Sequence, residues 1–318
     1  MHPILTSARR TIESVPPTLK GMALMLVVTF SFSAQLALVK MVSVDLHPFE
    51  IGFFRQFFGL IVFLPVFLRH GPGILRTRHF GLFSLRAVLE TTSMLMFFTA
   101  IAITPLAKAT ALHYTAPLFA TALAVIVLGE SIRLRRVLGL VFGFTGALVV
   151  VRPGAFGVDI GAALTVGSAA LWGSTMIIIK VLGRTESSVK ITIYNALLST
   201  PLALLAALPF WSTPTLDELG LMALAGAMGS LAHLALAQAF KLADVTAVLP
   251  VDFMRLIWAA VFGFILFAEV PQVWTWLGGI MIFSAVVYIA YRERQALDHE
   301  GTGNERPRPT PDAPQDGR

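Results

Sequence analysis

Residues 128–143 read LGESIRLRRVLGLVFG, and residues 267–279 read FAEVPQVWTWLGG. Each stretch ends an apolar run, passes through a glutamate and enters a second apolar run that contains glycine. Glu130 and Glu269 stand 139 residues apart, and the glycines that follow them keep the same spacing. The chain therefore contains an internal repeat of about 140 residues, and its fold is decided by how two copies of one unit pack together.

Ten mainly apolar runs follow one another along the chain, each near the roughly 20 residues that a membrane-spanning helix needs. They lie at 21–42, 50–69, 80–103, 107–128, 136–152, 159–182, 190–210, 219–240, 246–268 and 272–291. Each repeat holds five of them, and an odd number turns the second copy upside down in the membrane. We predict an all-α integral membrane protein of ten transmembrane helices in two inverted five-helix repeats. The predicted divisions are a cytoplasmic lead 1–19, a first repeat 20–153, a second repeat 154–293 and a disordered cytoplasmic tail 294–318.

The composition supports a membrane protein and excludes several other classes. The 318 residues are 56% hydrophobic and 13% charged, whereas soluble domains are about 25% charged. So few charged groups cannot cover the surface of a soluble protein, and the same hydrophobicity excludes a disordered chain. The absence of cysteine excludes a disulfide scaffold and a zinc site built on thiolates.

The positions of the basic residues predict the orientation. With the N-terminus placed in the cytoplasm, 18 of the 24 Lys and Arg residues fall on the cytoplasmic side, three lie outside or at outer helix ends, and three lie within helices. This asymmetry follows the positive-inside rule and predicts that both termini are cytoplasmic. The net charge of +6 is thereby explained by topology, and nucleic-acid binding is not expected.

The inverted repeat also suggests a function. Inverted repeats place a binding site near the middle of the bilayer, between two halves that rock around it. A transporter is the interpretation that this pattern favours. The alternative is a duplication that only builds a stable helical bundle.

The same residues resemble a known family. Two five-helix units, each ending in an aliphatic run with Gly129-Glu130 or Ala268-Glu269, resemble the EamA domain of the drug/metabolite transporter superfamily. Residues 47–51 (HPFEI) and 250–256 (PVDFMRL) are similar to a bacterial subgroup. The resemblance implies uptake of riboflavin-like or S-adenosylmethionine-like compounds, or export of amino-acid-like metabolites or drugs, across the bacterial inner membrane. Ala268 departs from the family, which usually has glycine there.

Ionisable residues inside the spans are candidates for the site, because burying them in a bilayer is costly. Arg86 and Glu90 stand four residues apart on one helix face, and Asp252 and Arg255 stand three apart on another. Each pair has two interpretations, as a substrate or proton-coupling site or as a structural ion pair. Arg55 has a third interpretation, because a long side chain near a span end reaches toward the interface, as we also expect for Lys40.

Less costly polar residues complete the candidate site. His113 and His233 are interpreted either as proton relays or as hydrogen-bonding partners of a neighbouring helix. Tyr114, Trp172 and Asn195 have the chemistry of a stacking and hydrogen-bonding pocket for a flat, polar metabolite.

The sequence has no nucleotide-binding loop and no hydrolase motif, so we expect no enzyme, no catalytic residues, no cofactor and no metal. A membrane-embedded lipid enzyme or a scramblase is the alternative of another class. The expected partners are a small metabolite, the lipid bilayer and, as a second candidate, protons. Gly139, Gly143, Gly278 and Gly279 allow close helix packing inside a monomer or at a homodimer face.

Overall fold

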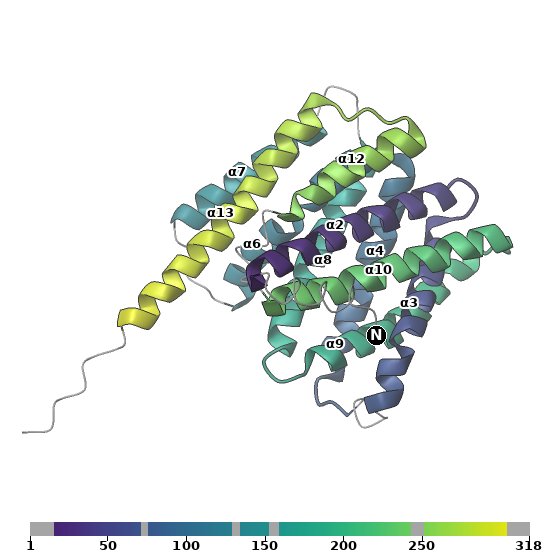
Figure 1. Ribbon diagram of the computed structural model, residues 1–318, viewed down its shortest axis with the longest axis horizontal. Coiled ribbons are helices and arrows are strands. Elements are labelled where there is room, and N and C mark those ends of the chain that lie inside the picture. The colour runs from purple at the N-terminus through teal and green to yellow at the C-terminus, as the bar shows by residue number, and fades with distance from the viewer. Residues whose placement is uncertain (1–15, 71–75, 129–133, 153–158, 243–250, 304–318) are drawn as a thin grey trace, which may run out of the picture.

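The computed structural model describes residues 16–70, 76–128, 134–152, 159–242 and 251–303 (Figure 1). Within these ranges the chain forms helices and no β-strand. The first half contains α2 (Pro17–Val42), α3 (Pro48–His70), α4 (Phe80–Ile103), α5 (Leu106–His113), α6 (Ala116–Leu128) and α7 (Leu134–Val151). The second half contains α8 (Ile160–Leu182), α9 (Ser188–Ala207), the short helix η2 (Leu208–Phe210), α10 (Leu216–Leu242), α12 (Met254–Phe267) and α13 (Val273–Gly303).

Helix length and hydropathy confirm the predicted membrane class. Seven helical segments among the described residues are long and apolar enough to cross a membrane, and two shorter apolar helices accompany them. Large apolar side chains point outward from the bundle, including Ile126 at 77% exposed and Ile265 at 69%. Lipid is the solvent that suits such a surface. The count of ten spans and the repeat boundaries stay predictions.

Two predicted spans are interrupted at corresponding places in the two halves. The run at 107–128 was expected to be one helix, but Tyr114 and Thr115 form a turn between α5 and α6. The physical reason lies at Pro117, which has no N–H to donate to the preceding turn, so that the helix must restart beside it. In the second half a turn at Phe253 precedes α12, three residues after Pro250.

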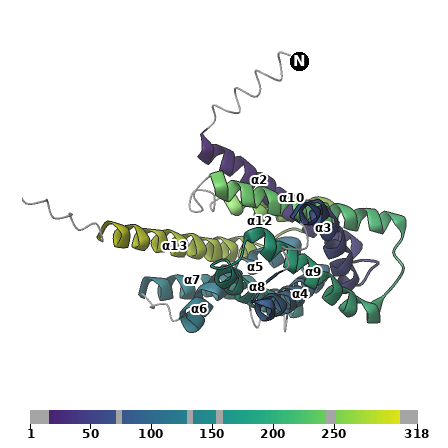
Figure 2. The ribbon, with the colours of Figure 1, turned by 90° about the horizontal axis from the view of Figure 1, so that it is seen from below.

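Several helix pairs join the two halves, and two of them have the most extensive contact. Helix α2 packs on α10, and α7 packs on α13, as Figures 1 and 2 both show. In the second pair a Cβ atom on Gly278 would collide with the Gly146 carbonyl oxygen, and one on Gly139 would lie 2.8 Å from Ile289. The glycines therefore let the two backbones approach, which confirms the predicted packing within one chain.

Helix α13 continues beyond the predicted span end at residue 291 to Gly303. The first ten residues of the predicted tail are thus helical, because arginine, glutamate, glutamine, alanine and leucine in this stretch are good helix formers. Residues 304–318, residues 1–15 of the predicted lead 1–19, and Glu130 of the repeat lie outside the described residues.

Candidate functional site

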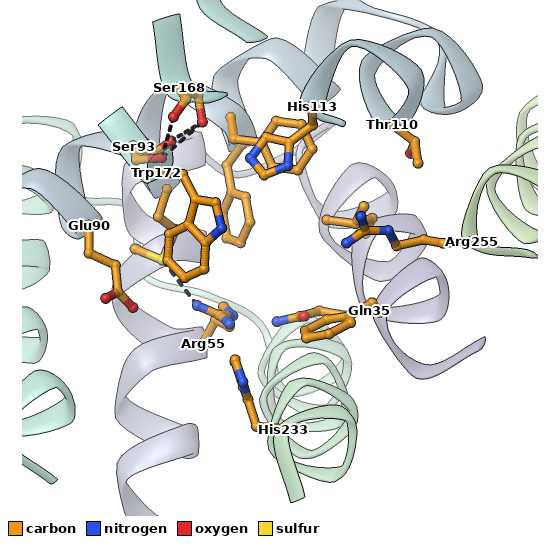
Figure 3. A pocket seen from close by; sticks show the side chains of 15 residues that line it. Gln35, Arg55, Glu90, Ser93, Thr110, His113, Ser168, Trp172, His233 and Arg255 are labelled. Carbon is orange, nitrogen blue, oxygen red and sulfur yellow. Dashed lines mark hydrogen bonds between the residues drawn. The ribbon is translucent and has the colours of Figure 1, made fainter. Parts of the chain in front are cut away.

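A cavity lies at the centre of the bundle, between the two halves (Figure 3). Its walls come from α2, α3, α4 and α5 of the first half and from α8, α10 and α12 of the second. It holds ≈ 860 Å³ of space that protein atoms do not fill, part of which is open to the outside. As a cavity volume that can be compared with known sites it measures ≈ 160 Å³, which is smaller than the roughly 300–1,000 Å³ of typical small-molecule sites.

The cavity gathers all ten residues that the sequence singled out. Six of them line it directly, namely Arg55, Glu90, His113, Trp172, His233 and Arg255. The other four stand behind the wall and contact lining residues, namely Arg86, Tyr114, Asn195 and Asp252.

The first predicted pair is formed, and a second-half residue joins it. Arg86 Nη2 lies 3.0 Å from Glu90 Oε2, and Arg86 Nη1 donates to the Ile191 carbonyl oxygen at 2.9 Å. Asn195 Nδ2 donates to Glu90 Oε1 at 2.7 Å. Glu90 therefore lines the cavity, while Arg86 on α4 and Asn195 on α9 each hold one oxygen of its carboxylate.

The second predicted pair links the two interrupted spans. Arg255 Nη2 lies 3.3 Å from Asp252 Oδ2, and the Arg255 guanidinium lies 4.7 Å from the centre of the Tyr114 ring. Tyr114 Oη donates to the Asp252 carbonyl oxygen at 2.7 Å. The break in the first half is thereby joined to the break in the second. Interrupted helices at matching places in inverted repeats are typical of transporter binding sites.

For Arg55, the interpretation that its side chain reaches toward the membrane interface is wrong. Its guanidinium points into the cavity, where Nη1 donates to Gln56 Oε1 at 3.0 Å and lies 3.2 Å from the Met94 sulfur (Figure 3). The Gln35 amide lies beside it, with its carbonyl oxygen as the atom suited to accept from Nε and Nη2. The side chain points inward because Gln35 on α2 and Met94 on α4 contact it there. The spacing of residues along the sequence does not reveal these contacts.

Lys40 is the second correction. It does not reach toward lipid, because its Nζ forms an ion pair with Glu269 and donates to the Thr104 carbonyl oxygen at 2.7 Å. Glu269 Oε2 also accepts from the Leu106 backbone N–H at 2.8 Å. A second ion pair, between Lys108 and Asp159, lies beside the start of α8. Both pairs join the first half to the second.

Sequence reasoning missed several uncharged residues of the cavity. Ser93 and Ser168 donate to each other's backbone carbonyls, each at 2.8 Å, and so tie α4 to α8. Gln35 and Thr110 also line the wall, and Thr110 Oγ1 has no hydrogen-bond partner among the described residues. The signal was present in the sequence, since each of these residues interrupts an apolar run, but the prediction rested mainly on ionisable and ring-bearing residues.

Aromatic rings form much of the remaining wall. The His113 ring lies 4.2 Å from the Phe97 ring, and His233 meets Phe32 edge to face at 5.3 Å. Trp172 projects between Glu90 and His113 in Figure 3. In the described part of the chain no three His, Asp or Glu residues cluster closely enough to hold a metal ion. The cavity is thus suited to a flat organic molecule that carries polar groups.

Comparisons with known proteins agree with this geometry. The model of the EamA-like transporter family matches residues 19–152 and 159–291, one match for each repeat. A solved crystal structure aligns with a TM-score of 0.60 at 18% identity, covering 87% of this chain and 98% of that one, and shows the fold alone.

Three curated relatives extend the comparison. The S-adenosylmethionine uptake transporter of Rickettsia bellii is 32% identical over 87% of this chain and 95% of its own length. The riboflavin transporter of Vibrio cholerae is 33% identical over 76% of this chain and 82% of its own. A pseudopaline exporter of Pseudomonas aeruginosa is 28% identical over 85% and 95%.

Proposed function

We propose that this chain, which belongs to the EamA-like transporter family of the drug/metabolite superfamily, takes up a small heteroaromatic metabolite. It is a multi-pass membrane transporter. The substrate class is that of S-adenosylmethionine or riboflavin. We propose further that the chain lies in the bacterial inner membrane with both termini in the cytoplasm, and that it performs no enzymatic step.

One observation supports this proposal above the others, namely a central cavity whose wall combines aromatic rings with charged groups from both halves. Phe97, Trp172 and the His113 ring offer flat surfaces, while Arg55 and Glu90 offer opposite charges. A heteroaromatic metabolite with polar groups needs both kinds of contact. The relatives named for S-adenosylmethionine and riboflavin transport such molecules.

The proposed mechanism is alternating access between the halves. The ion pairs Lys40–Glu269 and Lys108–Asp159 connect the halves at the end that the charge distribution predicts to be outside. They must separate when the cavity opens to that side, and the energy for this comes from substrate binding or from a proton gradient. Glu90 is the proposed proton-coupling group.

Uptake into proteoliposomes tests the proposal. Purified protein in liposomes is expected to accumulate labelled S-adenosylmethionine or riboflavin faster than empty liposomes, with and without an imposed pH gradient. Failure to take up either compound would contradict the proposed substrate class. Unchanged uptake in Glu90→Gln at every pH would contradict Glu90 as the proton-coupling group.

Export of an amino-acid-like metabolite is the second candidate, and the similarity to the pseudopaline exporter favours it. The same proteoliposomes distinguish the two. In vesicles sorted by orientation, movement of labelled substrate toward the cytoplasmic face of the protein supports an uptake system. Movement of the substrate away from the cytoplasmic face supports an exporter.

A further inference from the structure

The three arginines within the predicted spans differ in how their charge is balanced. Arg86 is paired with Glu90 one turn further along α4, and Arg255 is paired with Asp252 across the turn at Phe253. Arg55 forms no ion pair with any described residue. Glu90 and Asp252 balance two of the three arginine charges, and the third, unbalanced charge is that of Arg55.

The surroundings of Arg55 are polar but neutral. Its neighbours are the Gln56 side-chain oxygen, the Met94 sulfur and the Gln35 amide, and the Phe98 ring centre lies 5.9 Å from the guanidinium carbon. Glu90 attracts Arg55 from across the cavity, but Arg86 and Asn195 already hold that carboxylate. A guanidinium has five N–H donors in a fork that fits a carboxylate, and no carboxylate of the described residues forms an ion pair with this one.

A buried cation without a counter-ion is expensive, by several kcal/mol even after the surroundings relax. The cost is lower when a bound molecule supplies the missing negative charge. Because Arg55 lines the cavity, it has access to such a molecule, whereas Arg86 is held behind the wall by the Ile191 carbonyl oxygen.

We propose that Arg55, oriented by Gln35, binds a carboxylate group of the substrate, while the planar ring of the same molecule lies against Trp172 and Phe97. This inference rests on the proposed function and narrows its substrate class. S-adenosylmethionine has a carboxylate, and riboflavin has none, so the arrangement favours the first over the second.

The test uses pairs of compounds that differ only by the carboxylate. S-adenosylmethionine is compared with its decarboxylated form, and tryptophan with tryptamine, by ligand binding to the purified full chain. The wild-type protein is expected to bind the carboxylate member at least about tenfold more tightly in one pair or both, the range of one charge-assisted contact. In Arg55→Gln the ratio is expected to fall close to one.

Two further variants make the result specific. Trp172→Phe is expected to weaken both members of a pair alike and to keep the ratio. Arg55→Lys, which keeps the charge but loses the planar fork, is expected to give an intermediate ratio, and it serves if Arg55→Gln does not fold. An unchanged ratio in the Arg55 variants, or a wild-type ratio near one in both pairs, would overturn the proposal. Uptake in the proteoliposome assay without any carboxylate preference would overturn this inference while leaving the proposed function in place.

Discussion

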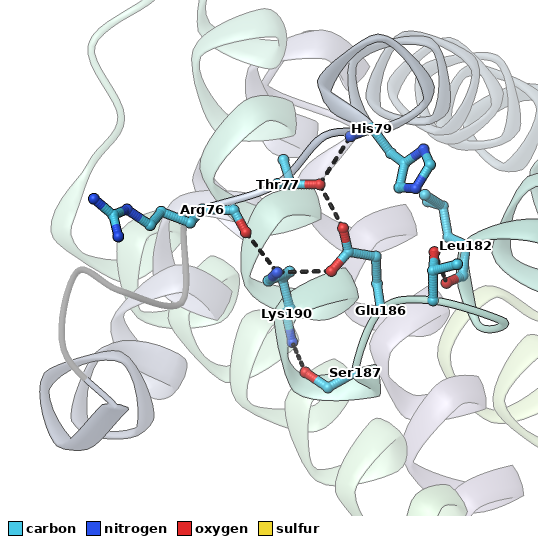
Figure 4. A network of polar contacts seen from close by, with 8 residues as sticks. Arg76, Thr77, His79, Leu182, Glu186, Ser187 and Lys190 are labelled. Carbon is cyan, nitrogen blue, oxygen red and sulfur yellow. Dashed lines mark hydrogen bonds and ion pairs between the residues drawn. The ribbon is translucent and has the colours of Figure 1, made fainter.

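Two polar regions at which the halves meet differ in how completely their hydrogen bonds are satisfied. In the end cluster, made of Arg76, Thr77, Glu186 and Lys190, Lys190 Nζ donates to Glu186 Oε2 and to the Arg76 carbonyl oxygen, each at 2.6 Å (Figure 4). Thr77 Oγ1 donates to Glu186 Oε1 at 2.5 Å and accepts from the His79 N–H.

The cavity contains similar polar side chains, but several of their hydrogen-bonding atoms have no partner among the described residues. Arg55 has no carboxylate partner among the described residues, and Arg255 Nε and Thr110 Oγ1 have no hydrogen-bond partner there. Unpartnered buried polar atoms are expensive, and inside a cavity a bound molecule can supply the missing partners. The comparison teaches that polar residues of one kind hold the fold where they satisfy one another and remain available for a ligand where they do not.

The largest expected effect comes from a residue behind the cavity wall that behaves like the end cluster. Arg86→Leu leaves Glu90 without its cation and the Ile191 carbonyl oxygen without a donor. Breaking a buried ion pair in this way is expected to lower the free energy of unfolding by about 3–5 kcal/mol. A large fall in the melting temperature in detergent would show it, and an unchanged melting temperature would contradict the structural role of Arg86.

A double variant separates structure from function at the same pair. In Arg86→Leu/Glu90→Gln both charges are gone, and the amide oxygen introduced in place of the Glu90 carboxylate can still accept from Asn195, so much of the lost stability is expected to return. Uptake is expected to stay low, because the carboxylate that faces the cavity is missing. Recovery of both melting temperature and uptake would show that Glu90 is needed only for folding.

The smallest effect is expected in the end cluster. Hydrogen bonds from Lys190 and then from Thr77 hold the pKa of the Glu186 carboxyl below its ordinary value of 4.5. A lowered pKa in the folded state stabilises the fold above pH 4.5, and the contribution is lost as the pH falls through the lowered pKa. Glu186→Gln is therefore expected to melt on the order of 2 °C lower than wild type at about pH 7, with a smaller gap near pH 4.

The readout for Glu186→Gln pairs melting curves at the two pH values with substrate affinity at neutral pH. Substrate affinity is expected to stay at the wild-type value, because the end cluster shares no residue with the cavity wall. A gap in melting temperature that widens on acidification would contradict the stabilising role of the ionised carboxylate.

Local spacing made part of the site predictable. Arg86 and Glu90 stand one turn apart on α4, so helix geometry brings that pair together. Asp252 and Arg255 stand on either side of the turn at Phe253, and their separation of only three positions keeps them close. The glycines of the repeat likewise predicted the contact between α7 and α13, because an approach of two backbones needs residues without a Cβ.

Contacts between distant segments were beyond the same reasoning. Lys40 meets Glu269 across 229 positions of sequence, and the inward turn of Arg55 depends on Gln35 and Met94 from two other helices. Distance to a span end places both the lysine and the arginine at the interface, and it carries no information about these partners. The break between α5 and α6 could have been predicted from the sequence, because Pro117 lies inside the apolar run.

Protection of an introduced cysteine tests most directly whether the cavity is the substrate site. The chain has no cysteine of its own, so Leu36→Cys in the cavity wall, at a partly exposed position, and Ser187→Cys beside the end cluster each give one thiol. Labelling with a small membrane-permeant methanethiosulfonate is measured with and without a compound that the proteoliposomes take up. We expect that compound to slow labelling at position 36 and to leave position 187 unchanged. Equal labelling rates at position 36 with and without the compound would contradict a central substrate site.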